Sequence, residues 1–497
     1  MNIEAFLRHH RMASNPFRGE EARQDAVFDR VEADCRHPDF EKILGDPAHP
    51  AAAVVFGERG SGKTALRLQL EAELASRDHE ESPGRVLVVG HDEFNPMLGR
   101  IGRAMREADP DRVLSAVSLS DHLDVVLAHA VPGVVDAILD RGDRGRGLRR
   151  RIRSMTESDR RELQRLHVLY DEATHGRSRS SRLRKALRLR GRTRAGLAAC
   201  GTIVLSMLAL LWAVAVGAGW VKGPEETVGL PVLILLLVAV PMGAWWAWQV
   251  IGLRRRSARI ARRLRAVEVP AGSVRARLRE IPPGMLATVV PPETAAADEW
   301  RIERFEGLAR GVRGLGLAGV VVLVDRIDEP VMVNGEASRM RALAWPLFRN
   351  KVLQMPGVGF KFLLPLELRD ALARESTEFF REARLDKQNL LERLGWSGAM
   401  LFDLCQARMA ACGDGDPPPR LMDLFDDSVS RQDVVDALDQ MQQPRDAFKL
   451  LYGLVSEHCS NVVDEEESFE IGRVTLDLVR KRQVERKEGM LRGVRPG

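Results

Sequence analysis

Two long apolar runs in the middle of the chain constrain its fold more than any other feature. Residues 195–221 and 228–253 contain no Asp, Glu, Lys, Arg or His, and only six residues separate them. As helices rising about 1.5 Å per residue, each would extend about 40 Å, which exceeds the roughly 30 Å hydrocarbon core of a bilayer. A pair of buried core helices is the alternative, but such helices rarely run this long without a charge. The sequence therefore predicts a transmembrane hairpin.

Basic clusters flank this predicted hairpin on both sides. Residues 177–194 contain nine Arg and Lys, residues 254–265 contain seven, and neither cluster contains an acid. The positive-inside rule predicts a multi-pass protein of the plasma (inner) membrane, with both termini in the cytoplasm. Anionic lipid headgroups are then the expected partners of the two clusters. Subtracting these 16 charges from the net charge of +5 leaves −11 for the rest of the chain, so a nucleic-acid partner is not expected.

A glycine-rich segment near the start of the chain matches a phosphate-binding pattern. An apolar run at 51–56 leads into GERGSGKT at 57–64, which fits G-x-x-x-x-G-K-[ST] between a predicted strand and a predicted helix. In this pattern, backbone N–H groups and the helix N-terminus surround the phosphates, while the lysine reaches the β and γ phosphates and the hydroxyl ligates Mg²⁺. A chance glycine-rich turn is the alternative. The expected phosphate-binding residues are Gly57, Gly60, Ser61, Gly62, Lys63 and Thr64.

A second acidic site is expected at the end of a neighbouring strand. The run VVVLV at 320–324 is typical of a central parallel strand that is covered on both faces. Asp325 follows it directly and would hold Mg²⁺ together with Thr64. Either Asp328 or Glu329, just beyond, could polarise the attacking water. An ordinary strand that ends in a polar turn is the alternative.

Two more apolar runs, 86–90 and 359–364, also predict strands. Together the four runs alternate with helical segments, as in a mostly parallel, doubly wound α/β sheet that binds nucleotide at its carboxyl edge. No guanine-reading [NT]-K-x-D tetrad follows, so ATP is favoured over GTP. The expected organisation is a helical lead-in at 1–50, two halves of a P-loop NTPase domain at 51–176 and 269–386, a membrane insert at 177–268, and a helical C-terminal subdomain at 387–497.

This combination of motifs resembles the KAP-type P-loop NTPases, which belong with the NACHT and other signal-transduction ATPases. The resemblance covers roughly residues 15–460 and depends on 57–64, on the hhhhDxxDE pattern at 320–329 and on the hairpin between them. It implies a membrane-anchored switch that binds ATP and hydrolyses it slowly. Pro444 and Arg445 resemble the C-terminal "PR" sensor of such ATPases, which implies that Arg445 approaches the γ-phosphate. An ordinary arginine at the start of a helix is the alternative.

Two departures from the family pattern leave a second function open. Arg326 stands where KAP proteins typically have an acid, and the strand at 359–364 ends without a polar residue to sense the γ-phosphate. Both departures favour a non-catalytic membrane scaffold that is stabilised by bound nucleotide. For a switch, assembly into a homo-oligomer and contact with a further protein partner are expected, because the state must be transmitted.

Overall fold

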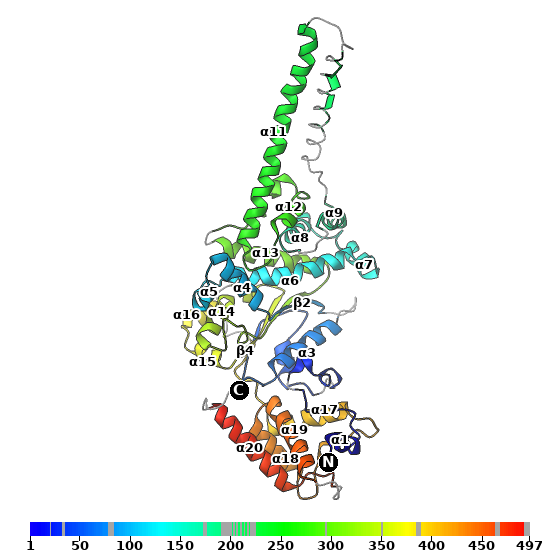
Figure 1. The fold of residues 1–497 in the computed structure, drawn as a ribbon, viewed down its shortest axis with the longest axis vertical. Helices are drawn as coiled ribbons and strands as arrows, with labels where there is room; N and C mark the ends of the chain where they lie inside the picture. The colour runs from blue at the N-terminus through cyan, green and yellow to red at the C-terminus, as the bar shows by residue number, and fades with distance from the viewer. Residues whose placement is uncertain are drawn as a thin grey trace.

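Figure 1 shows a central α/β body with a helical unit at one end and a long helix projecting from the other. This computed structural model describes the chain except residues 20, 32–34, 78–83, 172–175, 190–200, most of 202–224, 294–295, 349–350, 384–388, 463–467 and 492–497. Between 225 and 242 it describes the backbone but few of the side chains.

Five parallel strands form the central sheet in the order β2-β3-β4-β1-β5. They are β1 (Ala53–Gly57), β2 (Val86–His91), β3 (Gly319–Val324), β4 (Val358–Pro365) and β5 (Asn389–Leu391). The predicted α/β class is confirmed, and the sheet is consistent with a doubly wound fold. The strand β5 was not predicted; it lies beyond the expected boundary at 386 and pairs with β1. Three residues are too few for a periodic pattern, so only pairing defines this strand.

Helices cover both faces of the sheet. Val320, Val322 and Val324 contribute to the larger hydrophobic core, whereas Val321 and Leu323 contribute to a smaller core on the other face. Because both faces are covered, the strands consist of continuous apolar runs rather than alternating ones. The larger core contains residues of α6 (Leu119–Leu139), α13 (Ala296–Gly314) and α14 (Ala337–Phe348), and the smaller core contains residues of α2 (Phe40–Leu44) and α3 (Lys63–Ser76).

The helices beyond β5 form a separate unit with its own core, joined by the first helix of the chain. The N-terminal ammonium donates hydrogen bonds to the carbonyl oxygens of Cys459 (3.1 Å) and Val462 (3.0 Å). The N-terminus therefore packs against the end of α19. The unit comprises α1 (Ile3–His9), α17 (Gly398–Ala411), α18 (Arg431–Met441), α19 (Pro444–Asn461) and α20 (Arg473–Leu491).

The remaining helices are the projecting helix α11 and those that lie around the α/β body and at the base of the projection. They are α4 (Asn95–Met105), α5 (Pro110–Ser115), α7 (Asp143–Arg151), α8 (Glu157–Tyr170), α9 (Gly176–Ala186), α11 (Glu225–Arg263), α12 (Ala271–Leu278), α15 (Glu367–Ala373) and α16 (Thr377–Ala383).

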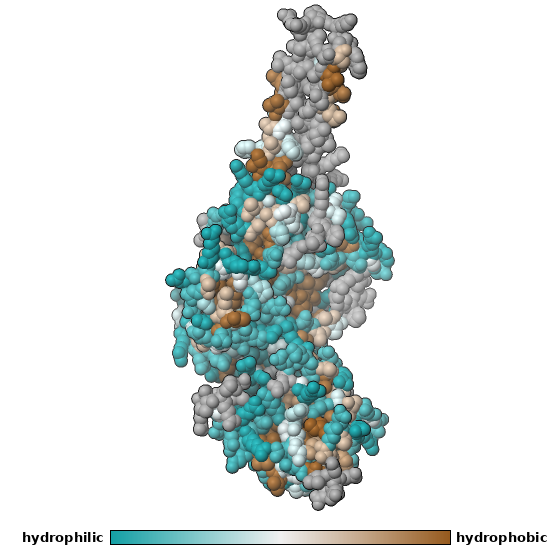
Figure 2. All heavy atoms as spheres, viewed as in Figure 1, coloured by the Kyte–Doolittle hydropathy of each residue, from teal (hydrophilic) through white to brown (hydrophobic). Residues whose placement is uncertain are grey.

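The projecting helix α11 contains the whole second apolar run, 228–253. Figure 2 shows brown, hydrophobic residues where this projection is coloured, above a mostly teal body. Most of the first run and the turn at 222–227 lie outside the described residues. Among residues whose side chains are described, α6 alone has the length and composition expected of a membrane span. However, 61% of that stretch is buried inside the protein, as in a core helix.

Candidate functional site

A short loop at 58–62 connects the carboxyl end of β1 to the first turn of α3. Gly60 and Gly62 have φ angles of 93° and 91°, a left-handed conformation that glycine adopts without steric cost. A Cβ atom at Gly60 would also lie 2.8 Å from Oε1 of Gln443. Two of the predicted phosphate-loop glycines therefore occupy positions that disfavour any other residue.

Lys63 begins α3, and no side chain caps the N-terminus of that helix. The Lys63 Nζ atom donates to the carbonyl oxygens of Gly57 and Glu58, both at 2.9 Å. Burial lowers the pKa of Lys63. Four carboxylates oppose that shift: Asp328, Asp325, Glu367 and Glu58. The ammonium therefore lies inside the loop and faces acids from three separate chain segments.

Thr64 and Asp325 meet across 261 positions of sequence. The Thr64 hydroxyl donates to Oδ2 of Asp325 at 2.9 Å. Asp325 is 1% exposed, and this burial raises its pKa even though the Thr64 hydrogen bond opposes the shift. Within the described residues, no three His, Cys, Asp or Glu side chains form a metal cluster. A hydroxyl and a carboxylate fit Mg²⁺, which takes one or two protein ligands and completes its shell with water and phosphate oxygens.

Ser61 shows that the loop has unmet hydrogen-bonding capacity. Its hydroxyl is buried, and no described group hydrogen-bonds to it, while its carbonyl oxygen accepts a hydrogen bond from Nε1 of Trp396 at 2.8 Å. A buried hydroxyl without a partner costs about 1–3 kcal/mol. A bound anion that accepts from Ser61 would remove this cost.

The two predicted water-polarising residues lie in different surroundings. Glu329 is half-exposed and ion-paired with Arg326, which itself adopts a left-handed φ of 62°. Asp328 is only partly exposed and is foremost among the carboxylates that act on Lys63. Of the two, Asp328 is therefore the acid whose charge faces the loop.

The start of α19 packs directly on the loop. The backbone N–H of Arg445 donates to the carbonyl oxygen of Gly60 at 3.4 Å. Glu58 is held by Gln443 and by Arg393, whose Nη2 lies 2.7 Å from the carboxylate. The backbone of Arg445 thus lies at this loop, and the approach of its side chain to a γ-phosphate stays a prediction. The contacts of Glu58 were not predicted, because its partners lie more than 300 positions away.

A second charged group beside Asp325 was also missed. Arg67, one turn after Lys63, lies with Nε 3.8 Å from Oδ2 of Asp325 and with Nη2 3.8 Å from Oδ2 of Asp92. Asp92 follows β2, which pairs with β3, and it also forms an ion pair with Arg23. An acid directly after a predicted strand was the available signal for Asp92.

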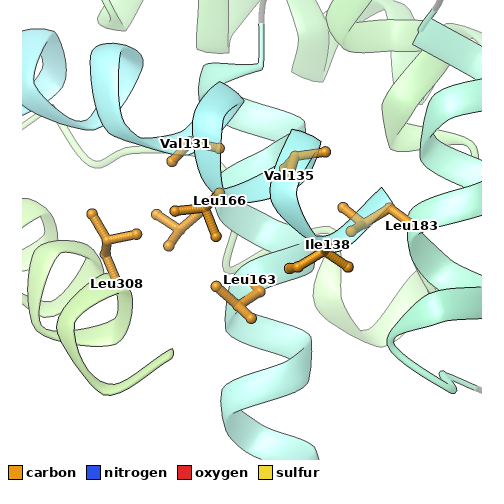
Figure 3. A pocket seen from close by; sticks show the side chains of 8 residues that line it. Val131, Val135, Ile138, Leu163, Leu166, Leu183 and Leu308 are labelled. Carbon is orange, nitrogen blue, oxygen red and sulfur yellow. The ribbon is translucent and has the colours of Figure 1, made fainter. Parts of the chain in front are cut away.

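A small cavity lies away from this site, among α6, α8, α9 and α13 (Figure 3). Its volume is about 10 Å³, and its lining is entirely aliphatic. Such a space is a packing void without a polar group to orient a ligand. It is lined by Val131, Val134, Val135, Ile138, Leu163, Leu166, Leu183 and Leu308.

No protein-family model matches this sequence, and comparison with curated proteins and with solved structures found no similar chain. A function is therefore inferred from the residues and geometry of the site.

Proposed function

We propose that the chain is a membrane-anchored P-loop NTPase of the KAP type. It binds Mg²⁺ and ATP and slowly hydrolyses the ATP as a signalling or assembly switch. The observation that carries this proposal is the contact between Thr64 and Asp325, next to a loop with two left-handed glycines. If the glycine-rich turn had arisen by chance, its contact with an aspartate at the end of a distant strand would not be expected.

Each group of the site has a role in this proposal. The backbone of the loop and Lys63 hold the phosphates, and the side chains of Thr64 and Asp325 hold Mg²⁺. The metal ion would neutralise charge on the phosphate oxygens when bound. Asp328 and Glu329 are the acids on the β3 side of the site, and Arg445 is the candidate sensor of the γ-phosphate.

Exposed apolar side chains support the membrane anchor. Leu237 is 70% exposed, Val240 is 65% exposed and Trp248 is 74% exposed, all on α11. Leu211, in the first apolar run, is 62% exposed. Large apolar side chains that project together from the body are favourable in lipid and unfavourable in water. The basic clusters at 177–194 and 254–265 would then meet anionic headgroups.

ATP binding and phosphate release by the detergent-solubilised protein test the proposal. We expect the wild type to bind ATP and release phosphate in a Mg²⁺-dependent manner. Lys63→Ala should weaken ATP binding at least about tenfold, because it removes a charge-assisted contact worth about 1.5–3 kcal/mol. Lys481→Ala, an exposed lysine of α20, is the matched control. Equal phosphate release by wild type and Lys63→Ala would refute an ATPase at this site.

The alternative, a nucleotide-stabilised membrane scaffold, is favoured by one observation. The ion pair between Arg326 and Glu329 engages an acid that hydrolysis would otherwise use. The scaffold predicts that ATP raises the thermal stability of the wild type while no phosphate is released. Phosphate release that Lys63→Ala abolishes would exclude it.

A further inference from the structure

The neighbouring strands β1 and β4 send their connections to opposite faces of the sheet. After β1, α3 contributes Leu66 and Leu70 to the smaller core, whereas after β4, α15 contributes Leu368 and Leu372 to the larger core. In open parallel sheets, ligands bind outside the carboxyl ends of the strands at such a reversal. At this edge of the sheet, the loop at 58–62 follows β1, and the start of α15 follows β4.

Lys63 and the segment before α15 both donate a hydrogen bond to one carbonyl oxygen. The carbonyl oxygen of Gly57 accepts from Nζ of Lys63 at 2.9 Å and from the backbone N–H of Leu366 at 3.1 Å. Glu367 is the next residue and the first of α15. Its side chain is exposed, and within the described residues no hydrogen bond or ion pair engages it. An exposed carboxylate therefore follows directly after the residue that hydrogen-bonds to the same Gly57 carbonyl oxygen as Lys63.

Two other acids at this edge have partners: Glu329 is ion-paired with Arg326, and Asp325 accepts the Thr64 hydroxyl. Asp328 is only partly exposed, so its carboxylate is less accessible to water than that of Glu367. Glu367 combines an exposed side chain with a carboxylate that forms no hydrogen bond or ion pair within the described residues.

We propose that Glu367 is a catalytic residue that orients the attacking water and takes its proton. This inference rests on the proposed ATPase function. The water oxygen forms a bond to the terminal phosphorus of ATP, and the bond from that phosphorus to the bridging oxygen breaks. ADP leaves with the electron pair, and the proton on Glu367 then passes to the released phosphate. The overall reaction converts ATP and water into ADP and inorganic phosphate.

Glu367→Gln tests the assignment beside Glu329→Gln and a matched control, Glu378→Gln, which changes an exposed glutamate of α16. General-base catalysis typically contributes 10²–10⁴-fold, so we expect phosphate release by Glu367→Gln to fall at least about 100-fold. ATP binding should be unchanged or several-fold tighter, because one negative charge leaves the surroundings of the triphosphate. Glu378→Gln should match the wild type in both measurements.

Several outcomes would overturn the assignment. Phosphate release by Glu367→Gln at the wild-type rate would overturn it. Loss of ATP binding together with loss of phosphate release would also overturn it, because that result indicates a structural role. Loss of release in Glu329→Gln alone would give the role to Glu329. A wild type that binds ATP but releases no phosphate would overturn Glu367 catalysis while leaving nucleotide binding in place. A wild type that binds no ATP would overturn the proposed function as well.

Discussion

At the scale of single residues, the loop at 58–62 depends on backbone conformation. Gly62 has a φ of 91°, yet an added Cβ would meet no atom closer than 3.9 Å. Any penalty for a side chain there is thus purely conformational. Gly133, in α6, has open space around it and an ordinary φ, so it makes a matched comparison.

Gly62→Ala and Gly133→Ala should change stability in opposite directions. A left-handed alanine costs about 1–2 kcal/mol, whereas alanine in place of glycine inside a helix gains about 0.5–1 kcal/mol. Thermal unfolding of the detergent-solubilised protein should show a lower midpoint for Gly62→Ala and a higher one for Gly133→Ala. Gly62→Ala should also weaken ATP binding. A shift in the same direction for both variants would contradict the conformational argument.

At the scale of elements, one buried aspartate joins α8 to α9. Asp171, at the end of α8, accepts hydrogen bonds from Nδ1 of His167 and from Nε of Arg179 in α9, both at 2.7 Å. Burial alone would raise the pKa of Asp171, but these two hydrogen bonds outweigh burial and hold it at about 2.

The low pKa makes the stability of this junction acid-sensitive. Relative to its ordinary value of 3.8, a folded-state pKa of about 2 contributes roughly 2 kcal/mol above pH 4, which is lost as the pH falls towards 2. Asp171→Asn should therefore be less stable than the wild type at pH 7 and lose less stability between pH 4 and pH 2. Unfolding midpoints at pH 7, 4 and 2.5 measure this, with Asp143→Asn, an exposed acid, as the control. If the unfolding midpoints of Asp171→Asn and of the wild type fell equally between pH 4 and pH 2.5, the proposed contribution of Asp171 would be contradicted.

At the scale of the whole molecule, the projecting helix is anchored in the α/β body. Leu253, near the base of α11, belongs to the larger core. Arg301 of α13 donates to the carbonyl oxygen of Arg263 at the end of α11 (3.0 Å) and to Asp124 of α6 (2.9 Å). Since α13 leads into β3, packed elements connect the base of the projection to Asp325.

The proposed membrane insert and the proposed nucleotide site should be separable. If residues 190–249 are replaced by a Gly/Ser linker, we expect loss of membrane association with ATP binding retained, because all of the site residues lie outside that segment. The full-length Lys63→Ala variant should keep its membrane association and bind ATP more weakly. Membrane flotation and ATP binding measure the two properties. Membrane association of the linker variant, or its failure to bind ATP while folded, would contradict the division.

The sequence by itself predicted those parts of the protein that local patterns encode. A strand, a glycine-rich turn and a helix follow one another at 51–70, and runs of apolar residues mark four of the five strands. Each such signal lies within one or two elements, so periodicity and turn chemistry are sufficient to recognise it. The burial of α6 was not predicted, because its deep core position depends on helices far along the chain.

Only the tertiary structure decided which of these elements meet. The strand order brings Thr64 to Asp325, places Glu367 beside the loop and adds β5 to the edge of the sheet. These contacts depend on pairings between segments hundreds of residues apart. No local pattern encodes them, because strand order is chosen by burial of the whole sheet.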